Sequence, residues 1–218
     1  MRYDPSTVEL FQSTHSLVLS RIEERLGEFR SIWDQCDEES ALRELLFCIL
    51  TPQSKARLCW EAIEEMACTG ILLNGTYDEI LEAVGKVRFK YRKTRFLMEA
   101  RDRFHREGDT NLLSFIREFD DAPEAREWLV KNIKGLGYKE ASHFLRNIGL
   151  GGDLGILDRH ILRSLNKAGV IEGIPGSLGN KGYLEIEERM REFSGNINIP
   201  LSHLDLVLWH VATGDIFK

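Results

Sequence analysis

The sequence has no long hydrophobic run, no low-complexity segment and no internal repeat that we detect. No apolar stretch approaches the roughly 20 residues that cross a membrane, and residues 1–12 lack the apolar centre of a signal peptide. We therefore expect a cytoplasmic globular protein that has no membrane partner. Its 218 residues are enough to bury a hydrophobic core without disulfides or metals.

Cysteines are few, and their spacing fits no metal site. The intervals of 12, 11 and 9 residues match neither a CxxC zinc pair nor a compact disulfide framework. The six histidines form no HxxxH or HExxH pair, so we predict no zinc or iron held by the protein. The four thiols, which we expect to be buried or partly exposed, are Cys36, Cys48, Cys59 and Cys68.

Helical periodicity dominates the chain. Residues 38–50 carry apolar side chains at the spacing of one helix face, and Thr51-Pro52 ends the pattern because the residue before proline avoids the helical conformation. No segment alternates strictly over four cycles, so any sheet is small or absent. We predict an all-α fold of two helical subdomains with a cleft between them. The other predicted helices cover 53–66, 77–84, 93–106, 112–119, 124–133, 138–148, 158–167, 183–193 and 201–213.

Charge is distributed unevenly. The net charge of −6, taken alone, argues against a nucleic-acid partner. Residues 86–106, however, hold nine basic and two acidic side chains, a net charge of +7, which leaves −13 for the remainder. Aromatic residues interleave these charges, a composition that suits phosphate contact and base stacking; the alternative is a solvated basic helix face. The predicted DNA contacts in this segment are Arg88, Lys90 and Arg92.

A glycine-rich turn between two predicted helices indicates a phosphate site. Gly135 and Gly137 flank Leu136, so we expect a tight hairpin whose backbone N–H groups point outward at the start of the next helix. Helix N-termini bind anions through unpaired donors and a positive dipole end. We predict that Gly135 and Gly137 contact the DNA backbone and that Leu136 is buried in the core.

This arrangement, over about residues 124–149, resembles the helix-hairpin-helix of DNA repair glycosylases. Lys139 and Asp158, nineteen residues apart, match the lysine and aspartate of the bifunctional members. The resemblance implies that the neutral Lys139 amine displaces the base at C1′ and forms a Schiff base, while the Asp158 carboxylate stabilises charge on the sugar. Taken singly, each has a structural alternative: a solvated helix residue for Lys139 and a helix N-cap for Asp158.

The chain as a whole is most similar to the type 2 8-oxoguanine DNA glycosylase/AP lyases. The likeness includes the turn at 50–56 and the ending 204–218. Endonuclease-III-like relatives carry a four-cysteine cluster near the C-terminus, and no cysteine follows Cys68, so we expect no iron–sulfur cluster. The resemblance implies one domain over 1–218, acting as a monomer, nucleoid-associated when engaged on double-stranded DNA that contains 8-oxoguanine. It implies no cofactor other than a monovalent cation at the hairpin when DNA is bound.

The same resemblance implies a pocket for an extrahelical base near the end of the chain. A chain ending at Lys218 offers a carboxylate suited to the N1 and N2 hydrogens of a guanine-type base. Trp209 and Phe89 are expected to stack on that base, although core packing is the alternative for Trp209. The predicted substrate-binding residues are Gln53, Phe89, Asp205, Trp209 and Lys218, and His160 is predicted to contact the DNA backbone.

Two other functions remain open on sequence grounds. The same scaffold could act on another oxidised base, for example a pyrimidine. A non-catalytic helix-hairpin-helix module would use the hairpin only to hold phosphate, and such a module does not require both Lys139 and Asp158. The leading hypothesis is a bifunctional enzyme that excises 8-oxoguanine and nicks the resulting AP site by β-elimination.

Overall fold

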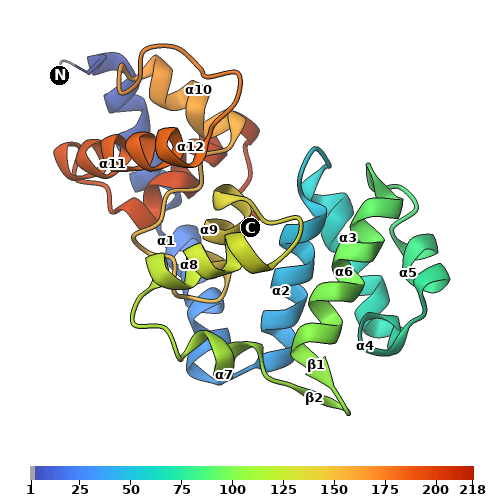
Figure 1. Ribbon diagram of the computed structural model, residues 1–218. Coiled ribbons are helices and arrows are strands. Elements are labelled where there is room, and N and C mark those ends of the chain that lie inside the picture. Colours follow the sequence, from blue (N-terminus) through green and yellow to red (C-terminus); the bar gives the residue numbers. More distant parts are fainter. Residues whose placement is uncertain (1–2) are drawn as a thin grey trace.

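The structure is a computed structural model that describes residues 3–218, so residues 1 and 2 of the predicted domain lie outside it. Over residues 3–218 the chain forms twelve helices and one antiparallel hairpin of β1 (His105–Arg106) and β2 (Asp109–Thr110) (Figure 1). The all-α prediction is confirmed. The helices are α1 (Pro5–Asp34), α2 (Glu38–Leu50), α3 (Ala56–Cys68), α4 (Ile71–Asn74), α5 (Tyr77–Ala83), α6 (Lys90–Phe104), α7 (Leu112–Ile116), α8 (Ala122–Asn132), α9 (Tyr138–Asn147), α10 (Arg159–Lys167), α11 (Asn180–Asn196) and α12 (Leu201–Thr213).

Helix α1 is the largest departure from the predicted helices, which begin only at residue 38. Asp4 caps it by accepting from the Thr7 N–H at 2.8 Å, and Pro5 suits its first turn. A narrow apolar stripe on a mostly polar helix gives a weak periodic signal, so the pattern missed it. No helix within residues 3–218 is both long and apolar enough to cross a membrane. The buried apolar residues of α1 are Phe11, Val18, Ile22 and Phe29.

Other predicted boundaries shift by a few residues. The bounds of α2 and α12 are those predicted. The helix predicted from residue 53 begins instead at Ala56, because Gln53 adopts a φ of +56°, a left-handed conformation that an α-helix excludes. Helix α10 begins one residue after Asp158, which caps it. Helix α6 begins at Lys90, three residues earlier than predicted.

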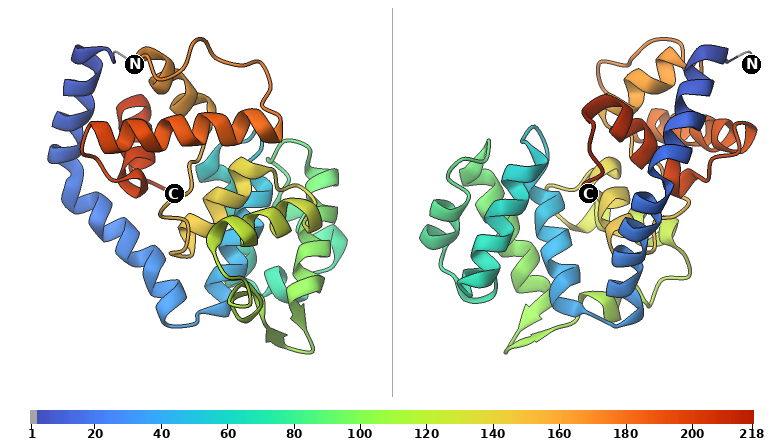
Figure 2. Two further views of the ribbon diagram at one scale, coloured as in Figure 1. Left: turned by 60° about the vertical axis from the view of Figure 1, so that its left-hand side comes forward. Right: turned by 180° about the vertical axis from the view of Figure 1, so that it is seen from behind.

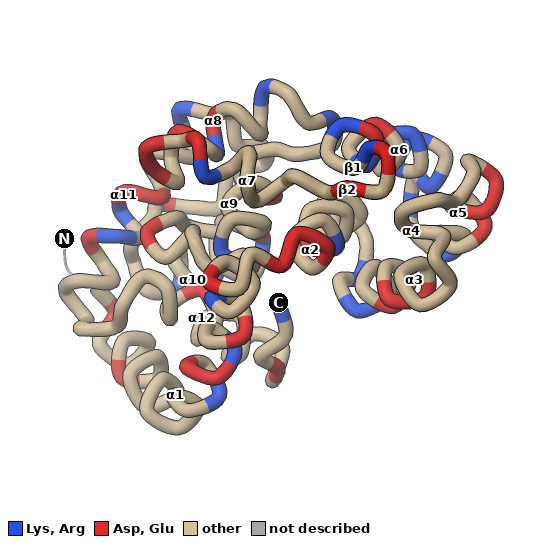
Figure 3. The backbone as a smooth tube through the Cα atoms, turned by 90° about the horizontal axis from the view of Figure 1, so that it is seen from below, with Lys and Arg blue, Asp and Glu red and all other residues tan. Residues whose placement is uncertain are grey.

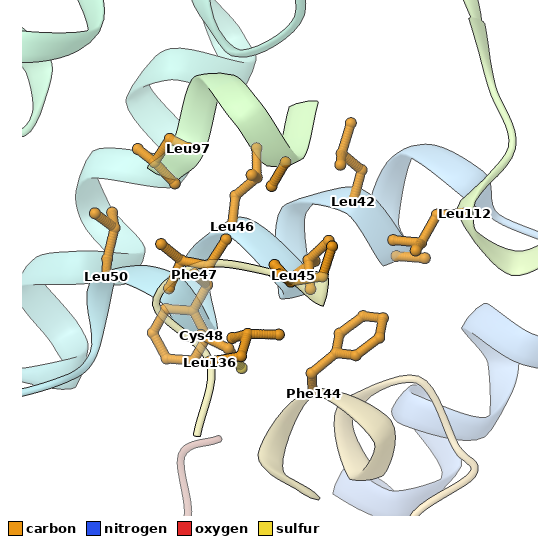
Figure 4. Close-up of a cluster of buried hydrophobic side chains, with 14 of the residues drawn as sticks. Leu42, Leu45, Leu46, Phe47, Cys48, Leu50, Leu97, Leu112, Leu136 and Phe144 are labelled. Carbon is orange, nitrogen blue, oxygen red and sulfur yellow. The ribbon is translucent and has the colours of Figure 1, made fainter. Parts of the chain in front are cut away.

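Two hydrophobic cores hold the helices together. The first core draws its side chains from α2 to α9, and α2 runs through its middle, since every residue from Glu44 to Leu50 is buried (Figure 4). Leu136 at the hairpin tip is buried in this core, as predicted. The second core is built by α1, α10, α11 and α12. Buried apolar area of this extent is the main source of stability for both.

The chain passes between the two cores in several places, including the start of α9, where Tyr138 belongs to the second core and Ala141 to the first. Helix α1 is the long blue helix of Figure 2. It contributes Ile22 to the second core and packs Trp33 against the first. The segment between α9 and α10 contributes Leu154 to the first core and Leu157 to the second. The last residues, 214–218, bury Ile216 in the second core and pack against the first. These crossings bring the end of α2, the start of α9 and the C-terminal residues to one place.

Candidate active site

A cleft of about 680 Å³ opens where elements of the two cores meet. Its walls come from the turn between α2 and α3, one face of α9, the start of α10, helix α12 and the last residues of the chain. Segments separated by more than 150 residues therefore face one space. The predicted site residues that line it are Gln53, Lys139, Asp158, His160, Asp205, Trp209 and Lys218.

Lys139 lies in the first turn of α9, directly after the hairpin. Its Nζ is 3.4 Å from Thr51 Oγ1, at the end of α2, and 3.4 Å from Glu140 Oε1. The side chain is 25% exposed, so the amine is open to the cleft while its stem is packed. This position places a potential nucleophile between the hairpin and the α2–α3 turn.

The hairpin that precedes Lys139 requires glycine at its first position. Gly135 has a φ of +93°, and a Cβ there would lie 2.8 Å from Phe96 Cδ2 and 3.3 Å from Ile49 Cγ2. The Gly137 N–H, predicted to point outward, instead donates to Glu140 Oε2 at 3.1 Å. The donors that remain at this helix start are the N–H groups of Tyr138, Lys139 and Glu140, which make no hydrogen bond within residues 3–218.

Asp158 combines a capping contact with exposure to the cleft. Its Oδ1 accepts from the Ile161 N–H at 2.8 Å, which makes it the N-cap of α10, as the structural alternative predicted. The carboxylate is half-buried and lines the cleft together with Lys139. A cap uses one carboxylate oxygen, so the cap fixes the side chain and still leaves a negative charge in the cleft.

A buried ion pair fixes the loop that leads to Asp158. The Glu187 carboxylate of α11 accepts from both terminal nitrogens of Arg126 in α8, at 2.6 and 2.9 Å, and from the Gly155 N–H at 2.7 Å. Tyr183 donates to the Gly155 carbonyl at 2.6 Å. Both members of the pair are buried. The loop is therefore tied to α8 and α11 three residues before Asp158.

Lys93 fixes the turn that carries Gln53. Its Nζ donates to the Leu50 carbonyl at 2.6 Å, the Pro52 carbonyl at 2.7 Å and Ser54 Oγ at 3.0 Å. Burial lowers the pKa of Lys93. The charge count grouped Lys93 with the basic stripe, and the structure corrects this: Lys93 points inward because the carbonyl groups at the end of α2 need donors.

The other predicted contacts of the 86–106 segment lie outside the cleft lining. Phe89 is 52% exposed with a φ of +61°, and its stacking on the extrahelical base stays a prediction. The Arg88 N–H donates to Ser54 Oγ at 3.2 Å, which attaches this segment to the Gln53 turn. Figure 3 shows the Lys and Arg positions along α6. Arg88 and Arg92 are exposed and Lys90 is half-buried.

The last residue is anchored by its side chain. Lys218 Nζ forms an ion pair with buried Glu44 and lies 3.5 Å from the centre of the Trp60 ring. Glu44 also accepts from Asn147 Nδ2 at 2.7 Å. The Lys218 ammonium therefore points toward α2. This ion pair holds the main chain of Lys218 at the cleft.

Trp209 packs on the cleft wall. Its ring meets that of His160 edge to face, with 5.1 Å between ring centres, and it belongs to neither hydrophobic core. Both residues are half-buried. Core packing was the alternative considered for Trp209. The indole instead packs against His160 at the cleft.

Comparisons with known proteins decide the family. The model of the family described as 8-oxoguanine DNA glycosylase matches residues 22–199. The chain belongs to the 8-oxoguanine DNA glycosylase family. It is 46% identical over 199 residues to the 8-oxoguanine DNA glycosylase/AP lyase of Fusobacterium nucleatum, covering 91% of this chain and 92% of that one. The relative from Methanocaldococcus jannaschii is 39% identical over 198 residues, which cover 90% of this chain and 91% of that one.

Solved structures of the 8-oxoguanine DNA glycosylase family have the same fold. The Methanocaldococcus jannaschii 8-oxoguanine glycosylase/lyase, in complex with a 15mer DNA containing 8-oxoguanine, superposes with a TM-score of 0.87 at 36% identity, over 97% of this chain and 99% of that one. The 8-oxoguanine DNA glycosylase of Thermotoga maritima gives a TM-score of 0.85 at 30% identity, over 97% and 98%.

Two cleft residues of this family member were not predicted from its sequence. His143 and Arg146 follow Lys139 at i+4 and i+7 on α9, so all three face the cleft. His143 was interpreted as a partly buried packing residue; it is buried against Phe47, but it also lines the cleft. The signal was the polar i, i+4, i+7 spacing, which the apolar stripe of the same helix obscured.

Asp205 lies beside these residues on α12. Burial raises the pKa of the Asp205 carboxyl, and the Arg146 charge opposes that shift. The Asp205 Oδ2 is 3.8 Å from Arg146 Nη2, and Oδ1 has no hydrogen-bond partner within residues 3–218. Buried polar atoms without a partner among the described residues therefore stand on both sides of this pair: Asp205 Oδ1, an acceptor, and Arg146 Nε and Nη1, which are donors.

His143 makes stability depend on pH. Burial first, and then the Arg146 and Lys139 charges, hold the pKa of His143 well below its ordinary value of 6.5, so the imidazole is neutral in the fold. Folding is therefore not opposed by His143 above about pH 6.5, where the imidazole is neutral in both the folded and the unfolded protein. As pH falls from about 6.5 toward the folded-state pKa, the unfolded chain takes up a proton that the fold does not, and the free energy of unfolding decreases by at most about 1.4 kcal/mol per pH unit.

The measurement is the free energy of urea unfolding between pH 7.5 and 5.5. We expect the wild type to lose more stability over this range than His143→Leu, which lacks the titrating group. Burial also lowers the pKa of His203, and that residue titrates equally in both proteins. Parallel pH profiles for the two proteins would contradict the assignment of a neutral His143.

Proposed function

We propose that this protein excises 8-oxoguanine from double-stranded DNA and nicks the strand at the resulting AP site. The observation that carries the proposal is that Lys139 and Asp158 face one cleft directly after the hairpin, in a chain of the 8-oxoguanine DNA glycosylase family. An amine nucleophile beside a carboxylate is the pair that the displacement of a base from a deoxyribose requires.

The chemistry begins at C1′ of the flipped nucleotide. The neutral Lys139 amine forms a bond to C1′ while the C1′–N9 bond breaks, and the electron pair of that bond leaves with the base. The Asp158 carboxylate stabilises the positive charge that develops on the sugar. The nitrogen of the adduct passes a proton to the departed base anion, the C1′–O4′ bond breaks as O4′ takes up a proton from solvent, and a protonated Schiff base forms at C1′. This Schiff base acidifies the C2′ hydrogen; when that proton leaves, a C2′–C3′ double bond forms and the C3′–O bond breaks, with its electron pair leaving on the phosphate. Water then releases Lys139.

The remaining residues hold the DNA and the base. Trp209 stacks on the base, Asp205 and the main chain of Lys218 accept its hydrogens, and Gln53 contacts the DNA near the vacated position. Phe89, exposed beside the Gln53 turn, stacks on the base together with Trp209. The predicted backbone contacts, which we keep as part of the proposal, are Arg88, Lys90, Arg92, His160 and the hairpin amides that follow Gly135 and Gly137.

The one cofactor in this proposal is a monovalent cation at the hairpin. The carbonyl groups of Lys134, Gly135 and Leu136 accept no hydrogen bond within residues 3–218, and such oxygens suit a hard cation. When DNA is bound, these carbonyls would hold a monovalent cation, which supplies a positive charge next to a phosphate. We propose a monomer of one domain over residues 1–218, located in the cytoplasm and on the nucleoid when engaged on DNA.

A lesion panel tests the proposed function. Under single-turnover conditions we expect excision from a duplex containing 8-oxoguanine to be at least about 100-fold faster than from duplexes containing thymine glycol or undamaged guanine. Asp158→Asn keeps a side chain that caps helices well, so it should fold while losing excision. Faster excision of thymine glycol would favour another oxidised base as substrate. Tight DNA binding without any excision would favour a non-catalytic module.

A further inference from the structure

Arg146 is a buried cation with unused hydrogen-bond donors. Its side chain is 5% exposed, and neither Nε nor Nη1 has a hydrogen-bond partner within residues 3–218. Burying a guanidinium is unfavourable unless its donors are satisfied. The one acidic partner is Asp205, whose Oδ2 lies 3.8 Å from Nη2, beyond hydrogen-bond distance. Nε and Nη1 are enclosed by the protein, whereas Nη2, which lies toward Asp205, is not among the enclosed nitrogens and also makes no hydrogen bond within residues 3–218.

The surroundings fix where that acceptor belongs. Arg146 lines the cleft two turns after Lys139 on α9, and its guanidinium lies over the Phe29 ring with 5.0 Å to the ring centre. It also borders a second cavity of about 360 Å³, lined by Glu23, Arg30 and His203, and Glu23 makes no ion pair with Arg146. Asp205 lines the cleft and not that cavity, and Nη2 is directed toward Asp205. Nη2 is therefore the guanidinium nitrogen that faces the cleft.

We propose that Arg146 is a catalytic residue that donates a hydrogen bond through Nη2 to a carbonyl oxygen of the extrahelical 8-oxoguanine. The inference rests on the proposed function. The lesion has two carbonyl groups, at C6 and C8, whereas its N7 and N1 carry hydrogens. A guanidinium nitrogen is only a donor and its plane holds it in a fixed direction, so Nη2 suits those carbonyl groups and rejects a base that presents hydrogens at the same place.

The charge of Arg146 also matters as the bond breaks. When the C1′–N9 pair leaves with the base, negative charge spreads from N9 onto the carbonyl oxygens. A fixed cation that is hydrogen-bonded to one of those oxygens attracts the departing anion more strongly than the neutral base. The interaction therefore stabilises the transition state more than the ground state and lowers the barrier to base loss. The anion then takes up the proton that the Lys139 amine loses after bonding to C1′. Strand nicking has no base present, so it does not involve Arg146.

The test is therefore a comparison of two substrates with one variant. For Arg146→Met we expect the single-turnover rate of 8-oxoguanine excision to fall by about 100- to 1,000-fold. We expect nicking of a duplex with a preformed AP site to stay within about threefold of wild type, because the lyase step needs Lys139 but no base contact. Arg146→Lys keeps the charge without the planar guanidinium, and its excision rate should lie between those of Arg146→Met and wild type.

The control is Arg30→Met, which removes an exposed cation from the second cavity and should leave both rates unchanged. Equal losses of excision and AP-site nicking in Arg146→Met, or no loss of either, would overturn the inference. If Arg146→Met does not fold, the same comparison with Arg146→Lys decides it: unequal losses support the contact and equal losses overturn it. A wild-type protein that neither excises 8-oxoguanine nor nicks an AP site would instead overturn the proposed function.

Discussion

Replacing Lys139 by glutamine is expected to abolish covalent capture of the protein on DNA containing 8-oxoguanine and to lower strand cleavage by at least about 10⁴-fold. Borohydride reduces a Schiff base to a stable amine, so it links the protein to DNA only when an amine of the chain has bonded to C1′. Glutamine has a similar length and cannot form that bond. Since Lys139 serves both base removal and nicking, both activities should be lost together.

The comparison requires a matched lysine. Lys131→Gln removes an exposed lysine from α8, in the same helix-hairpin-helix and away from the cleft lining. It should leave borohydride capture within about twofold of wild type, as is usual for an exposed position. Retention of the covalent adduct in Lys139→Gln would mean that another amine attacks the sugar, and the mechanism proposed for Lys139 would be wrong.

Replacing Glu187 by alanine is expected to lower the free energy of unfolding by about 3–5 kcal/mol, because it leaves the buried Arg126 charge unpaired. In a chain of this size that loss corresponds to a decrease in Tm of roughly 6–20 °C. The Gly155 N–H also loses its acceptor, so the loop before Asp158 is released at the same time. Urea unfolding at neutral pH, followed by circular dichroism, measures the effect.

The neighbouring Glu188 provides the control. Its side chain is exposed and pairs with Arg191 on the surface of α11, so Glu188→Ala should change stability by no more than about 0.5 kcal/mol. The pair itself is tested by the double variant Arg126→Met/Glu187→Ala. Its loss should be smaller than the sum of the two single losses, since each single change already breaks the same contact. Strictly additive losses would mean that the two side chains do not act as a pair.

The parts of the fold that the sequence predicted are those whose signals are local. Helix α2 has an apolar stripe along most of its length and a proline just beyond its end, so both bounds were predicted. Helix α1 was missed because its stability comes from sparse contacts with two separate cores, which a periodic pattern reports only weakly. Such a helix forms because of its tertiary packing, not because of the intrinsic helix propensity of its residues.

The site divides in the same way. Lys139 and Asp158 were predicted because their spacing around the hairpin is a chemical pattern that the residues themselves display. The direction of Lys93 could not be read from a count of charges, because it depends on where the carbonyl groups at the end of α2 lie in space. Arg146 was overlooked for a related reason: its unused donors exist only relative to Asp205, fifty-nine residues away.

The long helix α1 determines how the protein meets its substrate. Thirty helical residues span roughly 45 Å. This continuous helix packs its side chains into both cores, and other segments of the chain also pass between the cores. A hinge needs a short segment whose dihedral angles change freely, and an unbroken helix offers none. Any change in the width of the cleft must therefore bend this helix and shift its packing on both cores. We expect the duplex to bend instead, so sequences that kink easily around the lesion should be repaired faster than stiff ones.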